Sequence, residues 1–433
     1  MAAQKMTTPF GLLGRKLGHS WSRPIHEQLG SAPYSHVELE PDEVAGFTAN
    51  EAWRGLNVTI PYKAQAAASA DEKSPRVERL GVANTLVRRP DGTIYAENTD
   101  VLGFSWMLDR FCTRELAGPA AHVLDGKKAL VLGSGGAAQA VVAALEDAGA
   151  NVTVISRSGE DNYGNLLQKH SDAALIVNTT PVGMYPNCPA SPLTDEQLGG
   201  MHRLLGVLDV VYNPRKTGIC LAAERMGLPS ESGLAMLVAQ AFFASELFQG
   251  RELDRSLIEK IERDIASQTQ NIVLIGMPGA GKTSTGKRLS RALGRPFVDI
   301  DDAIAEEEGR TSAQIIEVEG ENAFRDVETR VTGEFAKKSG LVIACGGGVV
   351  TRERNRDLLR QNSSIVMIDR ALDELSSKGR PMSKSKGVEK LAQERMGAYL
   401  DWSDVHIRCT GSAEGDAALI MEKLGITPPN RSV

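Results

Sequence analysis

Apolar runs are followed by glycine-rich turns at two places in the chain. Ala129–Leu132 is apolar, glycines follow within 133–136, and an alanine-rich segment comes next. The apolar run 271–275 likewise precedes a glycine-rich stretch, 276–281, and a segment with helical periodicity. Strand, turn and helix in this order are typical of parallel sheets with crossover helices. The sequence therefore predicts an α/β protein with two units of the nucleotide-binding type.

Further short apolar runs follow each turn at the spacing expected for such units. They are 152–156, 174–178 and 206–212 after the first turn, and 295–301, 340–348 and 364–369 after the second. The first 128 residues contain apolar runs such as PFGLLG and GLNVTIP but no phosphate loop. We expect this region to form a separate α/β lobe.

Two helices are expected between the units. The apolar run Leu234–Phe248 is too short to span a bilayer and contains Gln240 and Glu246, so it predicts a buried helix. A second helix is predicted by five apolar residues that fall on one helical face and would dock on the first half, Leu253, Leu257, Ile258, Ile261 and Ile265. The polar SQTQ at 267–270 is the expected domain joint, which divides the chain into 1–268 and 269–433.

Composition limits the classes of partner. The 433 residues are too many for one ordinary core, and 42% are hydrophobic and 24% charged. The net charge of −6 argues against general nucleic-acid binding, so anionic ligands would be held by local clusters of cations and backbone N–H groups. Five cysteines without a C-x-x-C pair indicate neither a zinc site nor a disulfide framework. We expect a cytoplasmic protein with no signal peptide or membrane span, acting as a monomer or homodimer.

The first glycine turn, G-x-G-G-A at 133–137, suits a pyrophosphate at a helix N-terminus, although a purely structural turn would have the same sequence. The next predicted strand ends in Ser156 and Arg157, with no acidic residue. An arginine at this point accommodates the 2′-phosphate of NADP, whereas an acid would bind the ribose of NAD. The alternative is a solvated surface arginine.

Lys63 follows the apolar and polar stretch GLNVTIPY, and Asp100 lies in ENTD. These two side chains would form a proton donor and acceptor pair, with Asn57, Thr59 and Asn84 holding hydroxyl groups. A buried structural ion pair explains the same residues equally well.

Eight motifs in the first half resemble the shikimate dehydrogenase family in content and order, over roughly residues 9–262. They are GRKLGHSWS (14–22), NVTIPYK (57–63), GVANTL (81–86), NTD (98–100), GSGGA (133–137), NTTPVGM (178–184), DVVYNPRKT (209–217) and SGLAMLVAQ (232–240). The resemblance implies NADPH-dependent reduction of 3-dehydroshikimate to shikimate. It also implies a substrate lobe (about 1–110 plus the 240–266 helices) and a Rossmann-like NADP lobe (about 120–235).

The same resemblance implies roles for individual residues. Lys63 and Asp100 would be the catalytic pair. The substrate would be bound by these two residues with Ser20, Ser22, Asn57, Thr59, Asn84, Tyr212 and Gln240. NADP would be bound by Gly133, Ser134, Gly135, Gly136, Ala137, Ser156, Arg157 and Gly233.

The second turn reads G-x-x-x-x-G-K-T from Gly276 to Thr283, a phosphate-binding loop. Lys282 would reach the β- and γ-phosphates and the Thr283 hydroxyl would bind Mg²⁺. Downstream, Asp299 and Asp301 alternate at a strand end; one would serve the metal and one an acceptor hydroxyl, unless Asp301 or Asp302 is simply a helix N-cap.

Two more patterns in the second half have alternative explanations. Arg325 and Glu328 would be an ordinary surface pair if they stood alone. The glycines at 346–348 would allow a ligand to approach bare backbone, or they form a tight turn.

Together the second-half motifs resemble the shikimate kinase family over roughly residues 271–424. They are the P-loop, F-x-D-x-D (297–301), FRxxE (324–328), GGG (346–348), a G-R-P-M lid (379–382) with a reduced basic stretch before it, and R-x-x-x-Y (395–399). The resemblance implies Asp301 and Lys282 as catalytic residues and Asp301, Arg325, Gly347 and Arg395 as the shikimate site, with Glu328 supporting Arg325. ATP would be bound by Gly279, Ala280, Gly281, Lys282, Thr283, Ser284 and Arg380, and Mg²⁺ by Thr283 and Asp299.

Both halves imply the same intermediate, shikimate. The sequence therefore predicts a bifunctional enzyme that uses NADP(H), ATP and Mg²⁺, with a P-loop kinase domain on a parallel sheet after the two dehydrogenase lobes. The alternative is an active kinase fused to a dehydrogenase-like module that is inactive or uses quinate and NAD.

Overall fold

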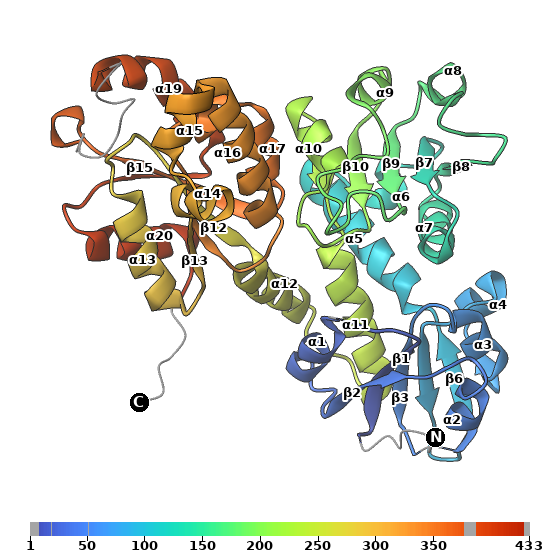
Figure 1. Cartoon of the computed structure of the whole chain (residues 1–433). Helices are drawn as coiled ribbons and strands as arrows, with labels where there is room; N and C mark the ends of the chain where they lie inside the picture. The colour runs from blue at the N-terminus through green and yellow to red at the C-terminus, as the bar shows by residue number, and fades with distance from the viewer. Residues whose placement is uncertain (1–7, 19, 51, 376–386, 428–433) are drawn as a thin grey trace. The chain divides into compact units, whose positions relative to one another are not determined.

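Three β-sheets organise the computed structural model, which describes residues 8–18, 20–50, 52–375 and 387–427 (Figure 1). The chain forms two compact units. The first runs up to residue 264 but excludes 183–190 and 213–221, which group with the second unit and the residues from 265 onward. The lobe bounds and the division after residue 268 stay predictions.

The first sheet is mixed and has the order β2-β1-β3-β5-β6-β4. Strands β1, β2 and β3 are parallel, and β5 runs antiparallel to both β3 and β6. The bounds are β1 Phe10–Gly14, β2 Tyr34–Glu38, β3 Gly55–Val58, β4 Glu72–Lys73, β5 Thr85–Arg88 and β6 Ile94–Glu97. Thr85 pairs with both Asn57 and Glu97, so the ends of β3 and β6 and the start of β5 meet at one edge.

Helices cover both faces of this sheet because side chains alternate along its strands. Leu13 of β1 packs in the cluster that includes residues of α2, α3 and α4, whereas Phe10 and Leu12 pack with Phe248 of α11. The helices are α1 Ser22–Gln28, α2 Val44–Asn50, α3 Lys63–Ala68, α4 Pro75–Leu80 and α11 Leu234–Gln249.

The second sheet is entirely parallel, in the order β11-β10-β9-β7-β8. Its strands are β7 Lys128–Leu132, β8 Asn151–Ile155, β9 Leu175–Asn178, β10 Gly206–Asp209 and β11 Ser230–Glu231. The helices are α6 Ala120–Val123, α7 Gly136–Asp147, α8 Leu166–His170, α9 Asp195–Gly199 and α10 Gly218–Arg225. The central strands are continuously apolar because helices bury both faces.

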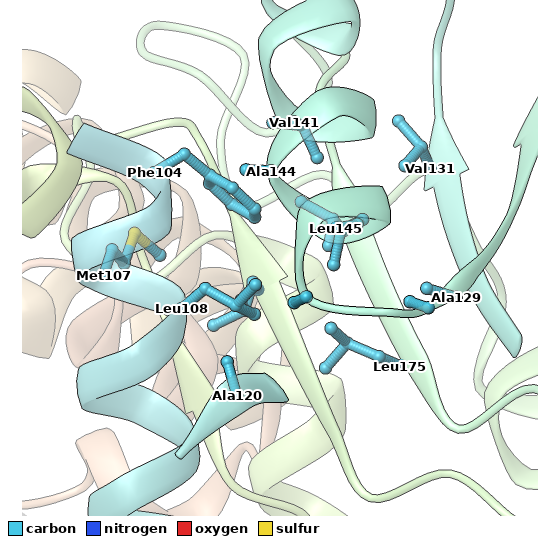
Figure 2. Close-up of a cluster of buried hydrophobic side chains, with 14 of the residues drawn as sticks. Phe104, Met107, Leu108, Ala120, Ala129, Val131, Val141, Ala144, Leu145 and Leu175 are labelled. Atoms are coloured by element: carbon cyan, nitrogen blue, oxygen red, sulfur yellow. The ribbon is translucent and has the colours of Figure 1, made fainter. Parts of the chain in front are cut away.

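Helix α5 (Thr99–Glu115) leads from the first sheet to the second. Its residues Phe104, Met107 and Leu108 pack against α7 and strands of the second sheet in one buried cluster (Figure 2). Gly103 of α5 permits close contact with α11, because a Cβ there would lie 2.8 Å from the carbonyl oxygen of Met236. The helix predicted at 234–248 is thus confirmed as a buried helix.

Helix α12 (Ser256–Thr269) corrects one expectation and bears on another. Leu253 precedes the helix, although Ile258, Ile261 and Ile265 are buried as predicted. The SQTQ segment is not a break in secondary structure: the amide of Gln270 still donates to Ala266, and β12 starts at the next residue. Polar side chains can continue a helix where they need no burial, so the polarity of this segment does not mark a break in the helix. Its role as the domain joint stays a prediction.

The third sheet is also parallel, in the order β13-β14-β12-β15-β16. Its strands are β12 Asn271–Ile275, β13 Phe297–Asp299, β14 Val342–Ala344, β15 Ser363–Asp369 and β16 Val405–Arg408. Its helices are α13 Lys282–Leu293, α14 Ile300–Glu308, α15 Ser312–Glu319, α16 Glu321–Ala336, α17 Arg354–Arg360, α19 Val388–Trp402 and α20 Ala413–Leu424. The predicted fold class, α/β with parallel sheets in both halves, is confirmed.

Candidate active sites

A cavity of about 370 Å³ in the first unit collects side chains from the ends of its strands and from five helices, α1, α3, α5, α7 and α11. All nine residues that the sequence suggested for substrate binding line it. They are Ser20, Ser22, Asn57, Thr59, Lys63, Asn84, Asp100, Tyr212 and Gln240.

Lys63 and Asp100 form the closest charged pair in this cavity. Lys63 is the first residue of α3 and Asp100 the second residue of α5, and Nζ lies 2.6 Å from Oδ2. The side chains keep 20% and 16% of their surface exposed, so both remain accessible from the cavity. This exposure distinguishes the pair from a sealed structural ion pair and leaves it open to a bound molecule.

Amide side chains hold Asp100 from the other side. Asn84 donates from Nδ2 to Oδ1 of Asp100 at 2.9 Å, and its Oδ1 accepts from the amide of Thr99 at 2.7 Å. Asn57 is oriented similarly, because Tyr34 donates to its Oδ1 at 2.8 Å and its Nδ2 donates to Thr85 at 3.3 Å. Sequence reasoning missed Tyr34, Thr85 and Thr99, which contact the amides rather than the cavity.

Three other lining groups are hydroxyl or amide side chains. The Ser20 hydroxyl donates to Ser22 at 3.0 Å, and Gln240 donates to the Leu237 carbonyl at 2.9 Å. Burial raises the pKa of the Tyr212 phenol, so it stays protonated and able to donate a hydrogen bond. Apart from Lys16, the cavity therefore offers one acid–base pair among neutral hydrogen-bonding groups, a suitable site for a small polyhydroxylated anion.

The first glycine turn lies at the N-terminus of α7, outside this cavity except for Ala137. Gly133 has φ +103°, and a Cβ there would lie 2.9 Å from Thr180, whereas a Cβ at Gly135 or Gly136 would meet nothing within 4 Å. The open backbone at a helix start suits a pyrophosphate.

Arg157 lies next to this turn. The amide of Gly133 donates to the carbonyl of Ile155 at 2.8 Å. The exposed Arg157 follows Ile155 by two residues, so its backbone is close to the turn. Gly233, the other cofactor candidate that lines the cavity, is the N-cap of α11, and a Cβ there would lie 2.1 Å from the Val210 carbonyl oxygen. Backbone packing alone therefore requires glycine at 233.

A second cavity of about 820 Å³ lies in the second unit, along the carboxyl edge of the third sheet. Among the predicted residues, Ala280 is fully buried and does not line it, and Arg380 lies outside the described residues. Those that do line it are Gly279, Gly281, Lys282, Thr283, Ser284, Asp299, Asp301, Arg325, Glu328, Gly347 and Arg395.

The phosphate-loop backbone depends on glycine. Gly276, Gly279 and Gly281 have φ of +139°, +94° and +99°, which other residues rarely adopt. Lys282 opens α13, and its buried ammonium donates to the carbonyls of Gly276 at 2.8 Å and Met277 at 3.0 Å. The lysine is thus held over the loop that would surround phosphates.

The two aspartates have different positions because β13 ends at Asp299. Asp299 is the N-cap of α14: its Oδ1 accepts from the amide of Asp301 at 3.1 Å, and its Oδ2 accepts from the Thr283 hydroxyl at 2.7 Å. The expected alternative of an N-cap at Asp301 or Asp302 is wrong. Burial and the nearby Asp299 raise the pKa of Asp301, while the Ser312 hydroxyl, which donates to it at 3.2 Å, opposes that rise.

Arg325 and Glu328 are buried, not a surface pair. Their side chains are 5% and 1% exposed, and Nη1 lies 2.6 Å from Oε2. Burial raises the pKa of Glu328, and Arg325 counteracts the rise. Arg395 donates to the Gly347 carbonyl at 3.0 Å. Two buried guanidinium groups therefore lie close to the glycine turn.

The three glycines at 346–348 allow these groups to approach the backbone. A Cβ at Gly346 would lie 2.8 Å from Glu328, at Gly347 2.6 Å from Pro278, and at Gly348 2.1 Å from Arg325. The turn is therefore built into the cavity wall. Lining residues to which sequence reasoning gave no role include Phe324, although it opens the FRxxE motif, and Ser312, Lys287 and Arg370, which belong to no recognisable motif.

The described residues contain no cluster of three His, Cys, Asp or Glu side chains arranged for a metal ion. The hydroxyl of Thr283 and the carboxylate of Asp299 are nevertheless oxygen donors of the kind that suits Mg²⁺, which usually keeps several waters. Within the same residues, no helix has the length and apolar character needed to cross a membrane.

Comparison with known proteins identifies each half. Residues 12–86 match the family model of the shikimate dehydrogenase substrate binding domain, and residues 278–425 match that of shikimate kinase. A shikimate dehydrogenase (NADP(+)) from Clostridium perfringens strain SM101 is 34% identical over 278 residues, which cover 59% of this chain and 97% of the relative.

Two solved structures agree with this relative. A chorismate mutase/shikimate 5-dehydrogenase fusion protein from Clostridium acetobutylicum is 31% identical with a TM-score of 0.54, covering 60% of this chain and 97% of that chain. Shikimate 5-dehydrogenase from Thermus thermophilus, in complex with NADP(H) and shikimate, is 32% identical with a TM-score of 0.50, covering 59% of this chain and 98% of that chain. The chain therefore belongs to the shikimate dehydrogenase family, and its residues 278–425 match the shikimate kinase family.

Proposed function

We propose that the protein is a bifunctional enzyme that reduces 3-dehydroshikimate to shikimate with NADPH and then phosphorylates shikimate with ATP to shikimate 3-phosphate. The observation that carries this proposal is the presence of two separate cavities, each lined by the reactive residues of one reaction. Family membership of the first half and the kinase match of the second support it.

In the first cavity, Lys63 would donate a proton from Nζ to the carbonyl oxygen of the substrate. NADPH supplies the hydride that reaches the carbonyl carbon. Asp100 accepts from Lys63 and keeps the ammonium directed into the cavity, while Asn84 fixes the carboxylate. Ser20 and Ser22 would bind the substrate carboxylate, and Asn57, Thr59, Tyr212 and Gln240 its hydroxyl groups.

The glycine turn and Arg157 would bind NADP. The open backbone at Gly135 and Gly136 would receive the pyrophosphate, and Arg157 would pair with the 2′-phosphate. No acidic residue at 156–158 is available for the ribose of NAD. The positive charge of Arg157, without an acidic neighbour, favours NADP over the alternative of a module that uses quinate and NAD.

In the second cavity, Asp301 would accept the proton of the shikimate hydroxyl that attacks the γ-phosphate. Arg325 and Arg395 would bind the acceptor carboxylate, since paired guanidinium groups suit carboxylates. Lys282 would stabilise charge on the transferring phosphoryl group. Thr283 and Asp299 would hold Mg²⁺, which when bound would supply positive charge to the phosphate oxygens.

Cytoplasmic localisation and a monomeric or homodimeric state also remain proposals. All five cysteines are free, which is compatible with a reducing compartment.

A coupled assay tests the whole proposal. The full chain is incubated with 3-dehydroshikimate, NADPH and ATP, and shikimate 3-phosphate is measured by mass spectrometry. We expect product only when both cofactors are present, and shikimate to accumulate when ATP is omitted. Parallel reactions with NADH in place of NADPH, or with 3-dehydroquinate in place of 3-dehydroshikimate, should be much slower. If the chain phosphorylates added shikimate but oxidises no NADPH when 3-dehydroshikimate is supplied, the dehydrogenase module is inactive.

The environment of Asp301 predicts the acid limb of the kinase pH profile. A carboxyl group whose pKa is raised loses its proton only at higher pH, so the base form, and kcat/KM with it, should decline at a higher pH than an ordinary aspartate would give. Ser312→Ala removes a hydrogen bond that lowers this pKa and should move the acid limb further upward. Initial rates across pH in wild type and variant check this; an acid limb that does not move with Ser312→Ala contradicts the role of Asp301 as base.

A further inference from the structure

Arg370 is a cationic residue of the second cavity for which neither reaction above has a role. It follows β15 directly, and Met367 of β15 pairs with Ile275 of β12, the strand that leads into the phosphate loop. Parallel strands end at one edge, so Arg370 leaves the sheet beside that loop. A Cβ added at Gly281 would lie 3.8 Å from Nη2 of Arg370.

The guanidinium groups of this cavity lie near two different loops, the glycine turn at 346–348 and the phosphate loop at Gly281. Among the described residues, three arginines line it. Arg325 lies against Gly348 and Arg395 donates to Gly347, so both belong to the glycine turn where the acceptor carboxylate would bind. Arg370 instead lies near Gly281 of the phosphate loop, where a nucleotide's phosphates would be held.

The contacts of Arg370 leave its charge largely uncompensated. Its guanidinium hydrogen-bonds the Cys409 thiol, which is a weak partner, and its Nε is buried without a partner. Asp416 and Glu374 act on it electrostatically, yet no described carboxylate comes within ion-pair distance. A planar cation with free donors is well suited to bind phosphate oxygens.

We propose that Arg370 is a nucleotide-binding residue that contacts the phosphates of ATP or ADP from the side of β15. This inference rests on the proposed kinase function and adds a cation that no motif assigns. The lid segment before Arg380 has few basic residues, so a cation supplied from the end of β15 would add positive charge at the phosphates. Because Arg370 is on a strand end, it would be in place before any nucleotide arrives.

Calorimetric titration of the full chain with ADP and Mg²⁺ tests the proposal. We expect Arg370→Ala to raise the Kd for ADP about tenfold, the loss expected for one hydrogen-bonded charge at a partly exposed site. Arg370→Lys should recover part of the affinity, because the positive charge remains while the planar set of guanidinium donors is lost. Adenosine, measured by competition with ADP, should bind equally well to wild type and both variants.

Arg354→Ala is the matched control, since Arg354 is exposed on α17 and does not line the cavity. Thermal unfolding and NADPH-linked reduction by the same preparations check that the variants are folded. An unchanged Kd for ADP in Arg370→Ala, or an equal loss for adenosine, overturns the phosphate contact. If the wild-type chain itself binds no ADP, the kinase assignment fails. If the wild type binds ADP but the variants do not differ from it, only the role of Arg370 fails.

Discussion

Lys63→Ala should reduce NADPH-linked reduction of 3-dehydroshikimate by about a thousandfold or more, whereas phosphorylation of added shikimate should continue at the wild-type rate. Nζ of Lys63, which is paired with Asp100 in the first cavity, would be the proton donor to the substrate, and general acid catalysis contributes about 10²–10⁴. The loss should appear mainly in kcat, because Asn57, Thr59 and the serines would still bind substrate. NADPH oxidation followed by its absorbance on the purified variant measures it, with a coupled ADP assay for the kinase.

The variant should fold normally. Asp100 keeps its hydrogen bond from Asn84, and the exposed parts of both side chains limit the cost of losing the pair to roughly 1 kcal/mol. Lys73→Ala is a matched control, because Lys73 is an exposed residue of β4 outside the cavity. Loss of both activities in Lys63→Ala, with folding intact, would falsify the assignment of two independent sites.

The strongest predictions from sequence came from segments whose signals are local. The strands β7 and β12 and the turns after them were found because an apolar run and obligatory glycines lie within a dozen residues. The length of an apolar run also identified α11, which is apolar all round and therefore buried. The fold class follows from such local signals, because a parallel sheet needs a crossover helix after each strand.

Features that depend on distant contacts were not predictable. The spacing of Arg325 and Glu328 gave a helical pair, but their burial arises from the glycine turn at 346–348, which is remote in sequence. Thr85 and Tyr34 were missed because they act on Asn57 through strand pairing, not through a motif. The N-cap at Asp299 depended on where β13 ends, and strand ends are poorly marked by composition.

Lys282→Ala should produce the reverse result: kinase turnover should fall by about 10²–10³, and reduction of 3-dehydroshikimate should be unaffected. The ammonium of Lys282 is buried and donates to the phosphate-loop carbonyl of Gly276, where it would meet the charge that develops during transfer. Without it, Mg²⁺, the loop amides and the proposed contact of Arg370 would be left to stabilise the transferring group. Steady-state kinase kinetics with saturating ATP and shikimate measure the loss in kcat.

Lys282→Met separates charge from packing in this test. The methionine retains most of the apolar stem, so a packing effect would be largely restored, while the electrostatic effect would not. Lys390→Ala on α19 serves as the matched control, because Lys390 is exposed and does not line the cavity. If Lys282→Met turns over ATP like wild type, the phosphate-loop assignment is wrong. If both Lys282 variants lose only kinase activity, the chain carries two reactions whose chemical steps depend on different lysines.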